Sequence, residues 1–250
     1  WLAGAALVHS LSATEKRGVF KSWTILLALL AFSLSLLGTF LVRSGILVSV
    51  HAFASDPERG LFILAFLFLV IGGSLLLYAL RAPVMKGGAA FALISRENFL
   101  LINNVLFSIS LTVVLLGTLF PLISTALDLG SYSVGAPYFN AMFAPLGLLT
   151  VFIMGFAPFI TWQKFKLFKH QLIQWALCFL MALLLSVLLI HALSQQFSVN
   201  FNVFAFVVTS LCLWLILNTL RHFFFRLKQG GRSFHSFGQL SLSYYGMVIA

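Results

Sequence analysis

The sequence predicts an all-α fold, a polytopic transmembrane helix bundle, and two observations lead to this prediction. Hydrophobic residues make up 61% of the 250 residues and charged residues only 8%, whereas about 25% of the residues in an ordinary soluble domain are charged. The apolar residues also occur in long runs, close to the ~20 residues that an α-helix needs to cross a bilayer. We therefore expect about eight spans, of which the first and the last are truncated.

The expected helices follow one another with short polar connections. They are placed at 1–14, 22–43, 60–80, 99–121, 139–161, 172–193, 200–220 and 237–250. Pro145 and Pro158 fall inside the fifth of these segments, and we expect them to kink it. Pro121 lies at the expected end of the fourth, where a missing backbone donor costs little. The motif Leu-Leu-Gly-Thr occurs at 36–39 and at 115–118, either as a site of close helix approach or by chance in a Leu-rich chain.

The distribution of basic residues predicts an orientation in the membrane. Thirteen of the fifteen Lys and Arg residues fall in the first, third, fifth and seventh connections, and only Arg43 and Arg59 fall in the others. Short loops rich in Lys and Arg stay cytoplasmic. We expect a bacterial inner membrane protein with basic cytoplasmic loops, a Trp1 end toward the periplasm, and periplasmic loops at 44–59 and 122–138.

Several classes of function are disfavoured. The net charge of +10 is spread between apolar runs and forms no single basic surface of the kind that binds nucleic acid, so we expect membrane lipid but no nucleic acid as a partner. None of the five acidic residues lies inside an expected span, which argues against paired catalytic carboxylates. We find no P-loop, dinucleotide-binding glycine motif or nucleophile elbow. Cys178 and Cys212 lie inside apolar runs, without metal-ligand spacing.

Two histidines are candidate ligands. His9 lies in the first apolar run, at ~1.5 Å per residue about 10 Å below the basic surface, and an ionisable group at such depth suggests a functional site. Neutral imidazole binds metals and haem iron, but a histidine that hydrogen-bonds a neighbouring helix is an equal alternative. His51 lies in the rather apolar loop 44–59, which we expect to follow the outer membrane face; it is either a ligand there or an ordinary loop histidine.

The other four histidines are expected to have no role in catalysis. His170, His222 and His235 fall in basic connections, so we expect them to be solvated or to face lipid headgroups. His191 lies at the outer end of the sixth expected span, where a structural role is favoured.

A long ungapped segment resembles a known family. The runs GTFLVRSG at 38–45 and VSVHAFASDP at 48–57 closely resemble the CcmF-type cytochrome c haem lyase subunit. Further similar stretches are WLAG at 1–4 leading to His9, IGGSLLL at 71–77 and the pair Asn103-Asn104. The resemblance covers the whole chain. Because the chain begins with Trp1 and ends inside an apolar run, we interpret it as an internal fragment, a single transmembrane domain over 1–250.

The resemblance implies a function and a set of partners. CcmF-type proteins take haem from a periplasmic haem chaperone. Together with a thiol-handling partner subunit, they join the haem vinyl groups to the CxxCH cysteines of apocytochrome c at the periplasmic face. The resemblance also implies that this chain lacks one ligand of each haem, so we expect it to be inactive alone as a haem lyase.

The resemblance further assigns roles to three residues. His9 matches an axial ligand of a resident haem b, and His51 matches an axial ligand of the haem that is delivered as substrate, which makes His51 the catalytic candidate. Arg43 is a candidate for pairing with a haem propionate, since guanidinium suits carboxylates; an interfacial anchor is the alternative. The rival function is a secondary transporter or haem exporter, but transporters usually place ionisable groups near the midplane, and the expected spans contain no acid.

Overall fold

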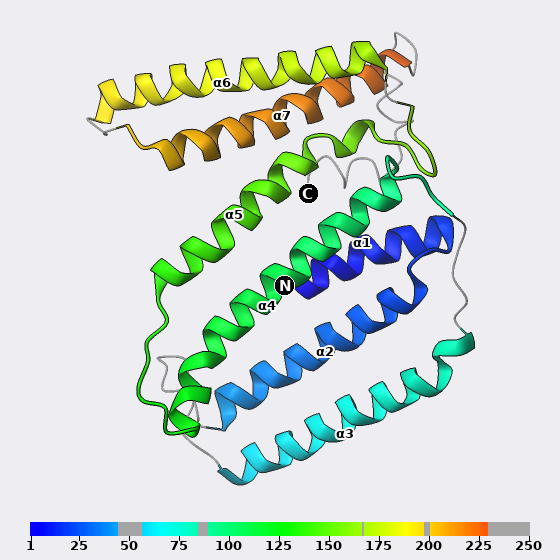
Figure 1. Ribbon diagram of the computed structural model, residues 1–250, viewed down its shortest axis with the longest axis vertical. Coiled ribbons are helices and arrows are strands. Elements are labelled where there is room, and N and C mark those ends of the chain that lie inside the picture. Colours follow the sequence, from blue (N-terminus) through cyan, green and yellow to red (C-terminus); the bar gives the residue numbers. More distant parts are fainter. Residues whose placement is uncertain (45–56, 85–89, 167, 198–200, 230–250) are drawn as a thin grey trace. The chain divides into compact units, whose positions relative to one another are not determined.

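The computed structural model describes residues 1–44, 57–84, 90–166, 168–197 and 201–229. Within these ranges the chain forms α-helices, two short 3-10 helices and no strand (Figure 1). The helices are α1 (Leu2–Arg17), α2 (Lys21–Arg43), α3 (Pro57–Arg81), η1 (Ala82–Val84), α4 (Arg96–Ala126), α5 (Ala136–Met154), η2 (Ala157–Phe159), α6 (Lys169–Phe197) and α7 (Val203–Gln229). The all-α prediction is confirmed.

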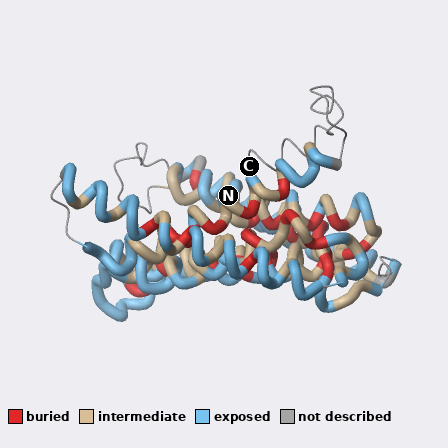
Figure 2. Tube along the Cα trace, turned by 90° about the horizontal axis from the view of Figure 1, so that it is seen from above, coloured by how far each residue is buried: buried red, intermediate tan, exposed pale blue. Residues whose placement is uncertain are grey.

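Six of these helices are long and apolar enough to cross a membrane, namely α2 to α7. Large apolar side chains are exposed on each of them, and Figure 2 shows exposed residues along much of the helices. Exposed apolar surface on this scale suits contact with lipid. At 16 residues α1 is shorter than these six. The expected span at 237–250 lies outside the described residues, so the predicted number of eight spans stays a prediction.

The chain divides into two compact units, which we describe separately. Unit 1 comprises Trp1–Phe91 and Leu100–Leu146, and unit 2 comprises Ala92–Phe99 and Gly147–Ala250. In unit 1, α1 packs against α2 and α2 packs against α3; in unit 2, α6 packs against α7. The single transmembrane domain and the periplasmic loops at 44–59 and 122–138 stay predictions.

Hydroxyl groups join the first two helices of unit 1. The Oγ1 atom of Thr24 on α2 lies 2.6 Å from the Oγ of Ser10 and 2.7 Å from the Oγ1 of Thr14, both on α1. Between them, Gly18 ends α1 in the left-handed conformation (φ 67°), which glycine adopts at no steric cost. Because polar groups in apolar surroundings need partners, this cluster favours one packing of α1 on α2.

Pro121 does not end its helix, contrary to our expectation. The fourth helix continues to Ala126, where Thr125 and Ser124 donate hydrogen bonds to the Pro121 carbonyl at 2.9 and 3.0 Å. One turn earlier, a Cβ on Gly117 would meet Tyr138 Cε1 at 2.5 Å. The second Leu-Leu-Gly-Thr motif is therefore a site of close approach. The first motif, at 36–39, makes no such close approach to any described residue, because a Cβ on Gly38 would meet nothing within 4 Å.

A core of aromatic rings organises unit 2. Trp214 of α7 is 1% exposed, and its Nε1 donates a hydrogen bond to the carbonyl of Phe152 at 3.1 Å. Its indole lies against Gly155, where an added Cβ would overlap Nε1 of the ring. The predicted fifth span is interrupted here: α5 ends at Met154, and Pro158 lies in the separate turn η2.

Candidate functional site

His9 on α1 is held by two residues of α4. Its Nδ1 lies 2.9 Å from the side-chain Nδ2 of Asn103. Its ring stacks on the ring of Phe107, with centroids 5.7 Å apart and an interplanar angle of 18°. Asn103 and Phe107 are four residues apart, so they lie on the same face of the helix. The two contacts together fix both the position of the imidazole and the direction of its ring nitrogens.

The hydrogen bond at Nδ1 decides which nitrogen of His9 can bind a metal. With the amide NH₂ donating to Nδ1, the proton of a neutral imidazole sits on Nε2. Turning the Asn103 amide by 180° places its Oδ1 there instead, which accepts a hydrogen bond from Nδ1–H and leaves a free lone pair on Nε2. Among the described residues, Nε2 has no hydrogen-bond partner. One arrangement is therefore suited to iron ligation through Nε2.

His9 and the two asparagines of α4 at 103 and 104 are largely closed off from solvent. His9 itself is half-buried, and Asn103 is 8% exposed. Its neighbour Asn104 is fully buried, and neither amide atom of its side chain finds a hydrogen-bond partner in the described part of the chain. An orphaned buried amide is costly, so the side chain of Asn104 is suited to a further polar partner.

Of the other predicted site residues, only Arg43 lies within the described part of the chain, and no contact between it and His9 is found there. Arg43 is the last residue of α2, with an exposed side chain. His51 lies outside the described residues, so its role as catalytic ligand stays a prediction. No group of three or more His, Cys, Asp or Glu within the described ranges could hold a metal ion. A haem iron, however, needs only one or two ligands from the protein, and His9 could supply one.

Two ionisable residues differ from the sequence-based expectation. His222 on α7 is not solvated but only 7% exposed, with its ring edge-on to Phe159 at 5.1 Å. Glu97, which we placed in a connection, is the second residue of α4 and is fully buried. Both of its carboxylate oxygens accept a hydrogen bond from the backbone N–H of Gln163, at 3.0 and 2.9 Å.

Exposure varies among the remaining described histidines and the cysteines. His170 and His191 are exposed, and His235 lies outside the described residues. Cys178 is half-buried and Cys212 exposed, without a metal-binding partner set in the described part. Asn103 had been singled out only as part of a resemblance. The signal that could have revealed its role is its place within an apolar run, where an amide requires a partner.

Curated proteins match the chain over its whole length, although no family model matches it. The cytochrome c-type biogenesis protein CcmF of Pseudomonas aeruginosa is 49% identical over 255 residues, covering 100% of this chain and 37% of that protein. The CcmF protein of Escherichia coli is 46% identical over 254 residues, with the same two coverages. The chain belongs to the CcmF family.

The match to CcmF proteins concerns one section of them, because the chain spans about 37% of the length of the curated relatives cited above. The related protein NrfE of Haemophilus influenzae, also named a cytochrome c-type biogenesis protein, is 38% identical over the whole chain. A solved structure named cytochrome c haem lyase CcmF has a TM-score of 0.66 with 24% identity, covering 100% of this chain and 35% of that one. It supports the CcmF fold.

Proposed function

We propose that this chain contributes to cytochrome c maturation as part of a CcmF-type haem lyase of the bacterial inner membrane. The observation that carries the proposal is the match of 46–49% identity along the entire chain to proteins named for cytochrome c biogenesis. The six apolar helices are in keeping with the membrane location. In the orientation predicted from the basic loops, the thioether bonds form at the periplasmic face.

His9 is proposed as an axial ligand of a resident haem b. Its Nδ1 is bound to Asn103 and its ring rests on Phe107, which is the arrangement that a ligand histidine needs: one nitrogen oriented by a neighbouring group and the other free. Bound haem would supply an iron centre that exchanges single electrons. His9 and Asn103 would hold that iron in place and set the basicity of the ligand.

His51 is proposed as an axial ligand of the substrate haem, with Arg43 pairing with a propionate. The role of the protein is to place a haem vinyl group beside a cysteine thiol, because the addition itself belongs to haem and thiol. The sulfur bonds one vinyl carbon and the thiol hydrogen goes to the other, so the addition needs no oxidant. The proposed partners are a periplasmic haem chaperone, apocytochrome c and a thiol-handling subunit.

The test is a pair of haem spectra on the full-length protein. We would record dithionite-reduced absorption and pyridine haemochrome spectra of the wild type, His9→Ala and His51→Ala. We expect His9→Ala to lose the b-type spectrum and His51→Ala to keep it but to lose bound substrate haem. His191→Ala is the matched control, because His191 is an exposed histidine of α6.

Two results would count against the proposal. Haem that persists at wild-type level in His9→Ala would remove the resident ligand assignment. A full-length protein that carries no haem under any condition would favour the rival class, a secondary transporter, which vesicle uptake of a small solute would then test.

A further inference from the structure

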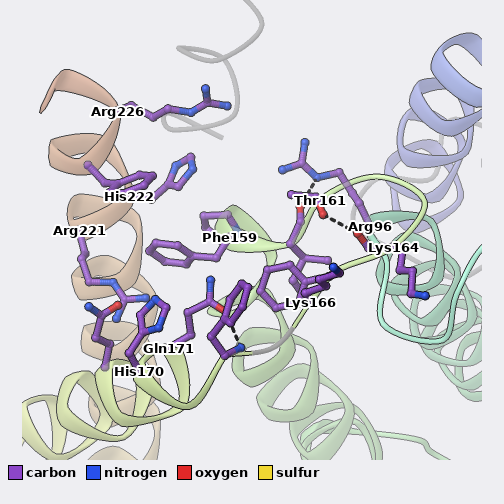
Figure 3. Close-up of a pocket in the computed structure, with 16 residues that line it drawn as sticks. Arg96, Phe159, Thr161, Lys164, Lys166, His170, Gln171, Arg221, His222 and Arg226 are labelled. Atoms are coloured by element: carbon purple, nitrogen blue, oxygen red, sulfur yellow. Dashed lines mark hydrogen bonds between the residues drawn. The ribbon is translucent and has the colours of Figure 1, made fainter. Parts of the chain in front are cut away.

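Unit 2 contains a cavity of about 710 Å³ with a strongly basic lining (Figure 3). The lining comes from the start of α4, from η2, from the connection between η2 and α6, from the start of α6 and from the end of α7. None of the lining residues is acidic. The cationic ones are Arg96, Lys164, Lys166, Arg221 and Arg226, accompanied by His170 and His222.

The cavity is lined by residues at the ends of helices that are apolar enough to span a membrane. Arg96 is the first residue of α4, Phe159 is the last residue of η2, and His170 is the second residue of α6. Arg226 lies in the last turn of α7. The ends of membrane-spanning helices lie in the headgroup region of the bilayer. The cavity therefore faces the layer that contains the phosphates of the lipids.

Two of the arginines are held in place by aromatic rings. The Cζ atom of Arg221 lies 4.0 Å from the centroid of the Phe159 ring. Arg96 donates a hydrogen bond from Nε to the Ile160 carbonyl at 3.0 Å, and its Cζ lies 5.4 Å from the centroid of the Trp162 ring. Stacked guanidinium groups lose little freedom on binding a ligand. The cationic groups are thus arranged before any ligand arrives.

The cavity also has electrostatic and hydrogen-bonding capacity that its own residues do not satisfy. Arg96 and Arg226 are close enough to repel each other, and both repel a positive charge on His222. The carboxylate of Glu97 offsets part of the charge of Arg96, but none of the described residues that line the cavity is acidic. The guanidinium group of Arg221 donates a hydrogen bond from Nη1 to the Sγ of Cys178 at 3.6 Å, and its Nη2 has no hydrogen-bond partner among the described residues. A bound anion would offset the repulsion and accept hydrogen bonds from these donors.

The rest of the lining favours an amphiphilic anion. Four phenylalanines line the cavity beside the cationic groups, namely Phe159, Phe165, Phe168 and Phe225. A zwitterionic headgroup would bring its own ammonium into a cationic site, which is unfavourable at short range. Basic pockets between membrane helices are known to bind anionic lipid headgroups. The volume lies within the range of about 300–1,000 Å³ that is usual for ligand sites.

We propose that this cavity binds the phosphate group of an anionic phospholipid. Arg221 and Lys166 supply cationic donors to the phosphate oxygens, the other basic side chains of the lining add to the positive potential, and the phenylalanines contact the adjoining glycerol and acyl carbons. The site would tie the ends of four helices to one lipid. The proposal is independent of haem binding, so its failure would leave the proposed function intact.

The test compares lipid binding by variants of the full-length protein. The protein would be purified in detergent, and the retained phospholipid would be counted by native mass spectrometry after addition of phosphatidylglycerol or phosphatidylcholine. We expect the wild type to retain phosphatidylglycerol in preference to phosphatidylcholine. The affinity for phosphatidylglycerol should be at least about tenfold lower in Arg221→Gln, because loss of a charge-assisted hydrogen bond has effects of this size. Lys166→Gln should also lower the affinity for phosphatidylglycerol. The side chain of Lys166 is exposed, so its replacement should not disturb folding.

Arg81→Gln is the matched control. Arg81 is also an arginine at the end of a membrane helix, but it lies in unit 1 on α3 and does not line the cavity. Equal loss of phosphatidylglycerol in Arg81→Gln and in both cavity variants would overturn the proposal, because it would show non-specific attraction. Inorganic phosphate and glycerol phosphate are added as competitors. Displacement of the lipid by either one at a similar concentration would show a site for free phosphate and overturn the lipid assignment.

Discussion

Replacing Gly155 by alanine is expected to destabilise unit 2 by about 2–6 kcal/mol. The added Cβ would overlap the indole Nε1 of Trp214 and would lie 2.5 Å from Cε2 and 2.7 Å from Cδ1. The ring has little room to move, because it is 1% exposed and packs against the rings of Phe152, Phe156 and Phe179. Overpacking of this kind costs about 1–3 kcal/mol. Displacement of the indole would also break its bond to the Phe152 carbonyl, at about 1–3 kcal/mol for a buried donor left unpaired.

The assay is thermal unfolding of the full-length protein in detergent, at one scan rate because unfolding of such proteins is often irreversible. We expect a clearly lower apparent Tm for Gly155→Ala. Gly72→Ala is the matched control, because a Cβ at Gly72 in α3 would meet nothing within 4 Å. Alanine is also the better helix former by about 0.5–1 kcal/mol, so the control should be neutral or more stable.

A double-mutant cycle tests the cause of the loss. Trp214→Phe removes the indole atoms that the new Cβ would meet, so Gly155→Ala should cost much less in the Trp214→Phe background than in the wild type. An equal cost in both backgrounds would refute the steric argument. An unchanged Tm in Gly155→Ala alone would do the same.

Three further predictions concern buried polar groups. Asn103→Leu should lower the affinity for the resident haem about 10–100-fold, as loss of a ligand-orienting partner does, and haemochrome titration measures this affinity. The control is Asn104→Leu, because the Asn104 amide has no partner among the described residues; this variant should keep an affinity near the wild-type value. Thr24→Val removes the hydroxyl shared with Ser10 and Thr14 and should cost about 1–3 kcal/mol. The loss of stability in Thr24→Val is measured as the apparent Tm. The hydroxyl of Thr39 is exposed, so an equally large effect of Thr39→Val would contradict the prediction for Thr24. Glu97→Ala leaves the backbone N–H of Gln163 without its carboxylate partner, so it should reduce the stability by about 1–3 kcal/mol and lower the apparent Tm. Glu58 is an exposed acid of α3, and Glu58→Ala should leave the apparent Tm unchanged.

The sequence by itself determined the fold class and the family. Runs of apolar residues long enough to span a bilayer are a local property, because a helix in lipid satisfies its own backbone hydrogen bonds. The seven expected helices within the described ranges are therefore all present, with ends shifted by up to nine residues. The helix end expected at Pro121 was wrong, because the helix continues there with hydrogen bonds from neighbouring hydroxyls to the Pro121 carbonyl.

Only the tertiary structure decided which distant residues meet. No local sequence pattern places the Nδ2 of Asn103 at 2.9 Å from the Nδ1 of His9, a residue 94 positions away. The same holds for the burial of Glu97 against the backbone of Gln163. The basic residues were visible in the sequence as separate loop charges. Their gathering into one cavity, around Phe159, required the ends of α4, α6 and α7 to come together. Helix packing brings such residues together through side-chain fit between elements, and neither periodicity nor composition encodes that fit.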